Sequence, residues 1–179
     1  MIDLDDPVWT ELRHCYGSGG NVPPLLRKLE DSKRPSRKFL DEFANILYHQ
    51  CTTGSASIAA FPHLVRIAGD NIETKKGTDT ISVAAFLLAY VLGSEGKLEP
   101  IPKFLREPFL TAISEGQDIV STMLFSAKRD FTTTAELLAV AAAFAWQPRL
   151  CLALDIQRSG TIMCPTCEDE FAIDRMFTF

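Results

Sequence analysis

The sequence of 179 residues has no apolar run long enough to cross a membrane. Its two longest apolar runs, residues 81–92 and 137–146, are well short of the ~20 residues that a bilayer-spanning helix needs. The first six residues, 1–6, are acidic and lack the basic and apolar regions of a secretion signal. We therefore expect a cytoplasmic protein that makes no use of a membrane.

The chain also lacks an excess of positive charge and every familiar catalytic motif. It carries 18 Lys and Arg against 23 Asp and Glu, a net charge of −5, so the molecule as a whole does not attract nucleic acid. It contains no glycine-rich nucleotide-binding motif, no zinc-protease motif and no nucleophile elbow. These absences favour a protein that is not an enzyme, and the sequence says more about the fold than about an activity.

Helical periodicity dominates what is present. Apolar residues recur every three or four positions in most segments before residue 159, and we expect eight or nine helices joined by short turns. Paired helices at a spacing of ~40–47 residues are typical of HEAT-type repeats, which stack into an α-solenoid. The sequence thus predicts an all-α, HEAT-like α-α superhelix over residues 1–158. Residues 159–179 are expected to form a small C-terminal knuckle with a C-x-x-C motif.

Prolines and glycines suggest where the helices begin, bend and end. Pro7 predicts a first helix that continues to Tyr16, and the glycine-rich stretch 17–20 predicts a helix–helix turn. Pro62 lies within an apolar stripe and predicts a bent helix, not a broken one. Residues 70–79 are interpreted as a polar linker, and Gly116 as a break between two helices.

A set of residues in the first half resembles a group of bacterial HEAT-like repeat proteins, most of them of unknown function. The resemblance covers residues 9–69, with two departures, Asn21 where aspartate is usual and Cys51 where glycine is usual. It implies the solenoid fold and a binding scaffold, and some small proteins of this kind are thought to be immunity-type partners of toxins. The matching positions are Trp9, Leu12, His14, Tyr16, Gly17, Val22, Pro23, Leu26, Leu47, Tyr48, His49, Gln50, Ser55, Ala56, Ser57, Ala59, Ala60, Pro62 and Leu64.

The histidines near the predicted turns admit three interpretations. They can stabilise helix ends by bonding terminal carbonyls, or they can line a groove that recognises another protein. They can also serve as a general base, with Cys15, Cys51 or Ser55 as nucleophile, if an open cleft brings those side chains within hydrogen-bond reach. For partner binding, the candidate residues are His14, Tyr16, His49 and Gln50.

Two further motifs have their own alternatives. Cys164 and Cys167 have the spacing of half a zinc site, so they indicate a metal-free knuckle, a zinc knuckle completed from elsewhere (a homodimer could do so), or a redox dithiol. A basic cluster with interleaved acids indicates a solvated surface or, alternatively, a nucleic-acid site. Its candidate residues are Lys33, Arg34, Arg37 and Lys38.

The favoured hypothesis is a non-catalytic protein–protein interaction module whose partner is an unidentified protein. A nucleic-acid-binding solenoid is the first alternative, and an unrecognised hydrolase is the second.

Overall fold

The computed structural model describes residues 1–49, 52–93, 101–126, 131–159, 161–163 and 170–172. These residues form seven α-helices, two short 3₁₀-helices and three two-stranded hairpins. The helices are α1 (Val22–Asp31), α2 (Arg37–Leu47), α3 (Ser55–Gly69), α4 (Lys75–Leu92), α5 (Lys103–Leu124), α6 (Phe131–Phe144) and α7 (Pro148–Ser159). The strands are β1 (Arg13–His14), β2 (Gly17–Ser18), β3 (Tyr48–His49), β4 (Thr52–Thr53), β5 (Thr161–Met163) and β6 (Glu170–Ala172), and the 3₁₀-helices are η1 (Pro7–Thr10) and η2 (Gly19–Asn21).

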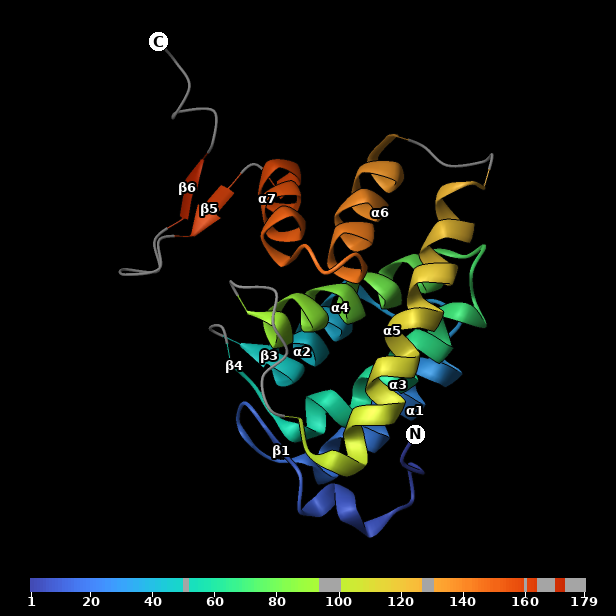
Figure 1. Ribbon diagram of the computed structural model, residues 1–179, viewed down its shortest axis with the longest axis vertical. Coiled ribbons are helices and arrows are strands. Elements are labelled where there is room, and N and C mark those ends of the chain that lie inside the picture. The colour runs from blue at the N-terminus through green and yellow to red at the C-terminus, as the bar shows by residue number, and fades with distance from the viewer. Residues whose placement is uncertain (50–51, 94–100, 127–130, 160, 164–169, 173–179) are drawn as a thin grey trace.

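The helices pack in two layers, which confirms the all-α prediction (Figure 1). In one layer α1 contacts α3 and α3 contacts α5, and in the other α2 contacts α4 and α4 contacts α6. The layers join where α3 packs on α4 and α5 on α6, and α7 packs against α6 and α4. The centre of the core shows the same arrangement, because the Phe61 ring of α3 lies 4.6 Å from that of Phe109 in α5 and 6.1 Å from that of Phe144 in α6.

The predicted first helix is wrong. After η1, the chain turns into the β1–β2 hairpin, in which His14 pairs with Gly17, and η2 then leads into α1. Gly17 has a φ of 148°, a conformation that favours glycine. Gly19 lies so close to η1 and α3 that a Cβ would sit 2.7 Å from the Ala56 Cβ. The stretch 17–20 thus forms strand β2 and the start of η2 and includes a close-packing site at Gly19, so it is not a connection between two α-helices.

Two other breaks predicted from the sequence lie inside helices. Gly116 is an interior residue of α5, so one helix replaces the expected two, and the described residues hold seven α-helices instead of eight or nine. Helix α4 already begins at Lys75, because the Thr74 hydroxyl accepts the Gly77 N–H at 3.2 Å and caps it, which shortens the expected linker. The continuity of α3 through Pro62 confirms that this helix is not broken.

The described C-terminal segments are a helix and a two-stranded hairpin. Helix α7 begins at Pro148, and β5 and β6 pair antiparallel with Met163 opposite Glu170. Cys164 and Cys167, the cysteines of the predicted knuckle, fall outside the described residues. Within the part of the chain that the structure describes, no helix combines the length and apolar character of a membrane span.

Helix α6 ends in an unusual way at Trp146. The Trp146 N–H donates to the Ala143 carbonyl at 3.0 Å and the Gln147 N–H to the Ala142 carbonyl at 2.9 Å, the pattern of a Schellman cap. Trp146 itself has a φ of 59°, in the left-handed region where this cap usually places glycine. The residue is 36% exposed. A bulky aromatic residue therefore occupies a position with an intrinsic conformational cost.

Candidate functional site

Two hairpins bring three of the four predicted partner-binding residues together. The Tyr16 ring contacts two imidazoles, with its centroid 6.5 Å from that of His14 and 5.3 Å from that of His49. His14 and Tyr16 belong to the β1–β2 hairpin and His49 to the β3–β4 hairpin. We call His14, Tyr16 and His49 the hairpin cluster. Gln50, the fourth predicted residue, lies outside the described residues.

The hairpin cluster is held on the first turn of α3. The Arg13 backbone N–H donates to the Ser55 hydroxyl oxygen at 3.0 Å, which ties β1 to this helix end. A Cβ at Gly54 would sit 2.1 Å from the Arg13 carbonyl oxygen, so only glycine permits this approach. The Ser57 hydroxyl donates to the Leu47 carbonyl at 2.6 Å and ties the end of α2 to the same turn. Both hairpins are therefore fixed relative to one helix.

The cluster combines a buried imidazole with an exposed aromatic ring. His14 is 9% exposed, whereas Tyr16 is 61% exposed, which is unusual for so large an aromatic side chain. The Tyr16 backbone N–H donates to Nδ1 of His14 at 3.1 Å. Tyrosine enriches binding surfaces because it supplies a large contact area at little cost in side-chain entropy.

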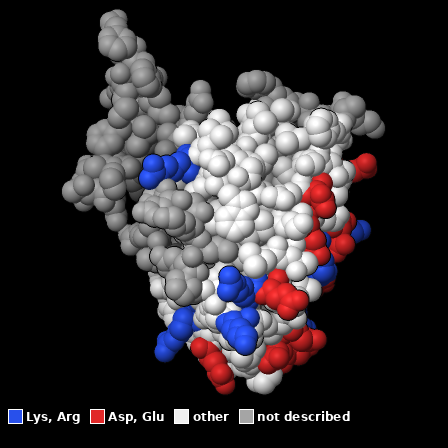
Figure 2. All heavy atoms as spheres, in the orientation of Figure 1, with Lys and Arg blue, Asp and Glu red and all other residues white. Residues whose placement is uncertain are grey.

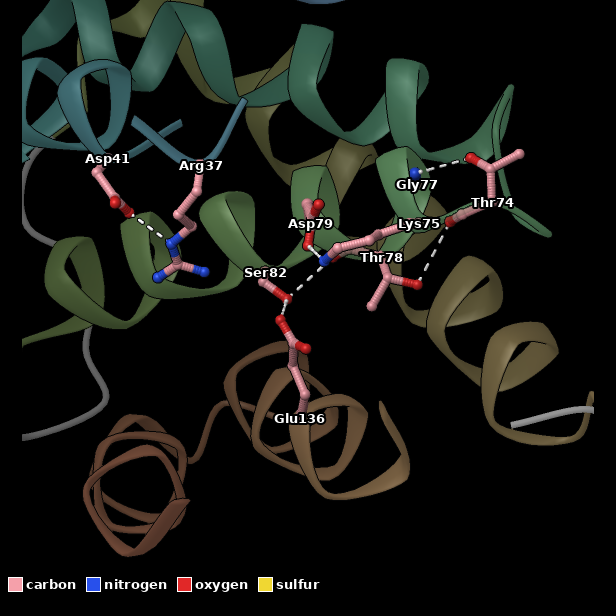
Figure 3. Close-up of polar contacts among 9 residues, drawn as sticks. All are labelled: Arg37, Asp41, Thr74, Lys75, Gly77, Thr78, Asp79, Ser82 and Glu136. Carbon is pink, nitrogen blue, oxygen red and sulfur yellow. Dashed lines mark hydrogen bonds and ion pairs between the residues drawn. The ribbon is translucent and has the colours of Figure 1, made fainter. Parts of the chain in front are cut away.

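A second candidate site is a polar groove between α2, α4 and α6 (Figure 3). Of the residues drawn there, the sequence analysis had named only Arg37 as a candidate. The Ser82 hydroxyl lies 2.7 Å from a Glu136 carboxylate oxygen and so joins α4 to α6. Nearby, Lys75 pairs with Asp79 at 2.8 Å. No sequence signal marks this groove, since its residues come from three helices that are far apart along the chain.

The groove contains a hollow of about 70 Å³ with a partly aromatic lining. Tyr48 and Phe86 contribute to the lining, and the Tyr48 ring stacks on Tyr90 with 5.1 Å between centroids. Burial, as the main cause, raises the pKa of the Tyr48 hydroxyl, and the neighbouring Tyr90 adds to the effect. The phenol therefore stays neutral under ordinary conditions.

The predicted nucleic-acid residues are partly neutralised. Arg37 pairs with Asp41 at 2.9 Å and Lys38 with Glu42 at 3.9 Å, both one helical turn apart. Lys33 and Arg34 are exposed and form no ion pair among the described residues. Figure 2 shows the same mixture, with blue and red side chains side by side over the lower part of the molecule and a mainly white centre. The surface drawn there has no continuous basic stripe.

Ser55 and His63 have structural hydrogen bonds in the part of the chain that the structure describes, and Cys51, another candidate nucleophile, lies outside it. The Ser55 hydroxyl oxygen accepts a backbone N–H and makes no hydrogen bond to an imidazole there. His63 is 3% exposed, and its Nε2 bonds the Ile2 carbonyl oxygen at 2.9 Å, which ties the first residues of the chain to α3 and differs from the predicted role of bonding helix-end carbonyls. No three His, Cys, Asp or Glu side chains in the described part group as metal ligands would.

Comparison with known proteins gave no match to this sequence among protein-family models, curated proteins or solved structures.

Proposed function

We propose that this chain is a HEAT-like α-solenoid of the bacterial cytoplasm that acts by binding another protein and not by catalysis. The observation that carries the proposal is the hairpin cluster, in which an exposed Tyr16 ring lies on two imidazoles whose hairpins are fixed to α3. Rigid, exposed aromatic side chains are typical of the residues that contribute most to protein–protein affinity. The regulatory or immunity-type role that the family resemblance implies is one form of this function.

The arrangement of the helices supports the solenoid part of the proposal. Alternate helices contact one another within each of two layers, which is the packing that stacked helix pairs produce. In such a stack each pair contacts mainly its neighbours, so one end can carry a binding site without rearranging the other. The hairpin cluster lies at the end formed by α1, α2 and the start of α3 (Figure 1).

The test is affinity capture from a bacterial lysate, with variants matched in chemistry. Tyr16→Ala removes the exposed ring of the hairpin cluster, and Phe125→Ala removes an 89% exposed ring at the end of α5. We expect the wild-type chain and Phe125→Ala to retain one salt-resistant protein that Tyr16→Ala loses, with all three equally stable to heat. Retention of the same partner by Tyr16→Ala would contradict the proposed location, and recovery of nuclease-sensitive material alone would contradict the function.

The nucleic-acid alternative depends on Lys33 and Arg34, which are exposed and form no ion pair among the described residues. It predicts a salt-dependent mobility shift of duplex DNA that charge reversal at these two positions abolishes. The hydrolase alternative requires an open cleft with convergent polar groups, and the groove of Figure 3 is the place to look for it.

We further propose that Cys164 and Cys167 bind zinc with ligands from a second copy of the chain. Two thiolates supply half of a tetrahedral site, so a homodimer of such motifs completes it. The proposal predicts one zinc ion for every two chains and dissociation of the dimer when the metal is chelated. Mass measurement in solution with and without a chelator tests both, and a monomer that retains no zinc would contradict it.

A further inference from the structure

The side chain of His63 holds the first residues of the chain against α3. Its Nε2 lies 2.9 Å from the Ile2 carbonyl oxygen, and because a carbonyl oxygen only accepts, Nε2 carries the proton of the neutral ring. Nδ1 is then an unprotonated acceptor. It is buried and has no hydrogen-bond partner in the part of the chain that the structure describes. A second proton would therefore create a buried N–H for which the described residues supply no acceptor.

The surroundings of His63 also disfavour a positive charge on its ring. Burial is the largest effect that lowers the pKa of His63. The Arg66 guanidinium and the Met1 amino group lower it further, while the bond to Ile2 and the Glu30 carboxylate oppose the shift without reversing it. The charged groups that act on the imidazole or border the hollow beside it are the amino group of Met1 and the side chains of Asp3, Arg27, Glu30 and Arg66.

Residues 1–6, which we call the N-terminal cover, are attached to the helices by few bonds. None of these six residues is buried, although two of their apolar side chains pack on the core. Besides the bond to the imidazole, the Asp3 carbonyl accepts the indole N–H of Trp9 at 2.8 Å, and Asp5 pairs with Arg27 at 2.6 Å on the surface. Local opening of so small a segment costs much less free energy than unfolding of the helices beneath it.

We propose that the N-terminal cover is a pH-sensitive latch, which detaches from α3 when His63 is protonated. Detachment relieves the buried N–H because a hydrated imidazolium donates both of its N–H groups to water. In the detached state the imidazole has its ordinary pKa of 6.5, so lowering the pH from 7 to 5 should raise the detached population about ten- to twentyfold. The latch is independent of the partner binding proposed for the hairpin cluster.

Hydrogen exchange followed by NMR tests the latch. The Trp9 indole N–H and the Asp6 backbone N–H, which donates to the Asp3 carbonyl at 3.1 Å, report detachment of the N-terminal cover. The backbone N–H of Leu64, inside α3, reports unfolding of the helices. Relative to intrinsic exchange, protection of the first two should fall about ten- to twentyfold between pH 7 and pH 5, a range that avoids most of the titration of carboxylates and of the amino group. It should not respond to dilute urea, because local opening exposes little surface, and it should stay below that of Leu64.

Matched variants assign the response to one imidazole. His63→Gln keeps an N–H that can donate to Ile2 but does not titrate, so the pH response should disappear. His49→Gln makes the same change in the hairpin cluster and should leave the response intact. Asp5→Asn removes the ion pair with Arg27 and should lower protection by the same factor at both pH values. If His63→Gln does not fold, ¹⁵N spectra of the imidazoles in the wild-type chain still decide whether Nε2 carries the proton at pH 7.

Four results would overturn the inference. They are a proton on Nδ1 at pH 7, unchanged protection of the N-terminal cover between pH 7 and pH 5, a pH response that His63→Gln retains, and urea-sensitive protection of the Trp9 indole equal to that of Leu64. The last result would mean that the cover leaves only when the helices unfold. None of them affects capture of a partner that Tyr16→Ala loses, so the latch and the interaction module can fail separately.

Discussion

The contact of Gly116 with the Phe144 ring makes a quantitative test of how α5 and α6 pack. A Cβ at position 116 would lie 2.1 Å from the nearest ring carbon, while ordinary contact begins near 3.4 Å, so ring or helix must move by about 1.3 Å. Phe144 is 1% exposed and also packs on Phe61, which prevents the ring from swinging away. Overpacking of this kind costs about 2–3 kcal/mol. Because alanine gains about 1 kcal/mol over glycine inside a helix, Gly116→Ala should lower the free energy of unfolding by about 1–2 kcal/mol.

Urea denaturation followed by circular dichroism measures this difference, and a double-mutant cycle tests its cause. Phe144→Leu removes the ring edge that the new methyl group meets, so Gly116→Ala in that background should be neutral or stabilising. Gly69→Ala is the control, because its Cβ meets only the flexible end of Ile119, at 3.0 Å, and should leave stability unchanged or raise it. A neutral or stabilising effect of Gly116→Ala with Phe144 present would refute the packing argument.

Three other outcomes are expected. Burial is the main cause that lowers the pKa of His63, so the unfolded chain binds a proton at this residue more readily than the folded chain does. The free energy of unfolding should therefore fall as the pH drops through about 6.5 toward that lower pKa. In a series of urea melts at different pH, His63→Gln should reduce this fall. Lys76 is 7% exposed and donates to the Glu30 carbonyl at 2.7 Å, so Lys76→Met should lower the free energy of unfolding by about 1.5–3 kcal/mol. The control is Lys75→Met at an exposed neighbour, which should lower it by less than about 1 kcal/mol. Equal losses in the two variants would show that the buried hydrogen bond is unimportant. Burial also raises the pKa of Cys151 to about 12, so peptide mapping after thiol labelling at pH 8 should find this cysteine modified only in unfolded protein, and rapid modification in the folded state would contradict its burial.

Helix location was predictable because it depends on a local pattern. The stripe from Phe39 to Leu47 becomes the buried face of α2, and the alternation of apolar and polar positions contains that information. The same reasoning failed between Pro7 and Tyr16. There, spacing alone predicted a helix, but the close approach of Gly19 to α3 and the β1–β2 hairpin, in which Gly17 has a positive φ, decide the structure. Contacts with a distant element are invisible in the local pattern.

Glycine shows the limit most clearly. Gly116 was interpreted as a helix break, since glycine is a poor helix former, yet it lies within α5 because the ring of Phe144 needs the space. Glycine can either end a helix or make room for a packed side chain inside a helix, and only the neighbouring residues in the fold distinguish the two roles. His14, Tyr16 and His49 were grouped as candidates because they lie near predicted turns, but the geometry of the hairpin cluster was not predictable. That His14 accepts the Tyr16 N–H depends on a turn that the sequence analysis had placed inside a helix.

The chain's two tryptophans make it a protein with a fluorescent reporter at each end. Trp9 is 2% exposed and its indole N–H donates to the Asp3 carbonyl at 2.8 Å, whereas Trp146 is 36% exposed at the end of α6. A buried indole emits at shorter wavelength than a hydrated one and is shielded from soluble quenchers. In the solenoid proposed above, helix pairs depend mainly on their neighbours, so the two ends are expected to lose structure at different denaturant concentrations. The native emission spectrum therefore combines a buried and a partly exposed indole, and the order in which their surroundings unfold tests the proposed solenoid without an attached dye.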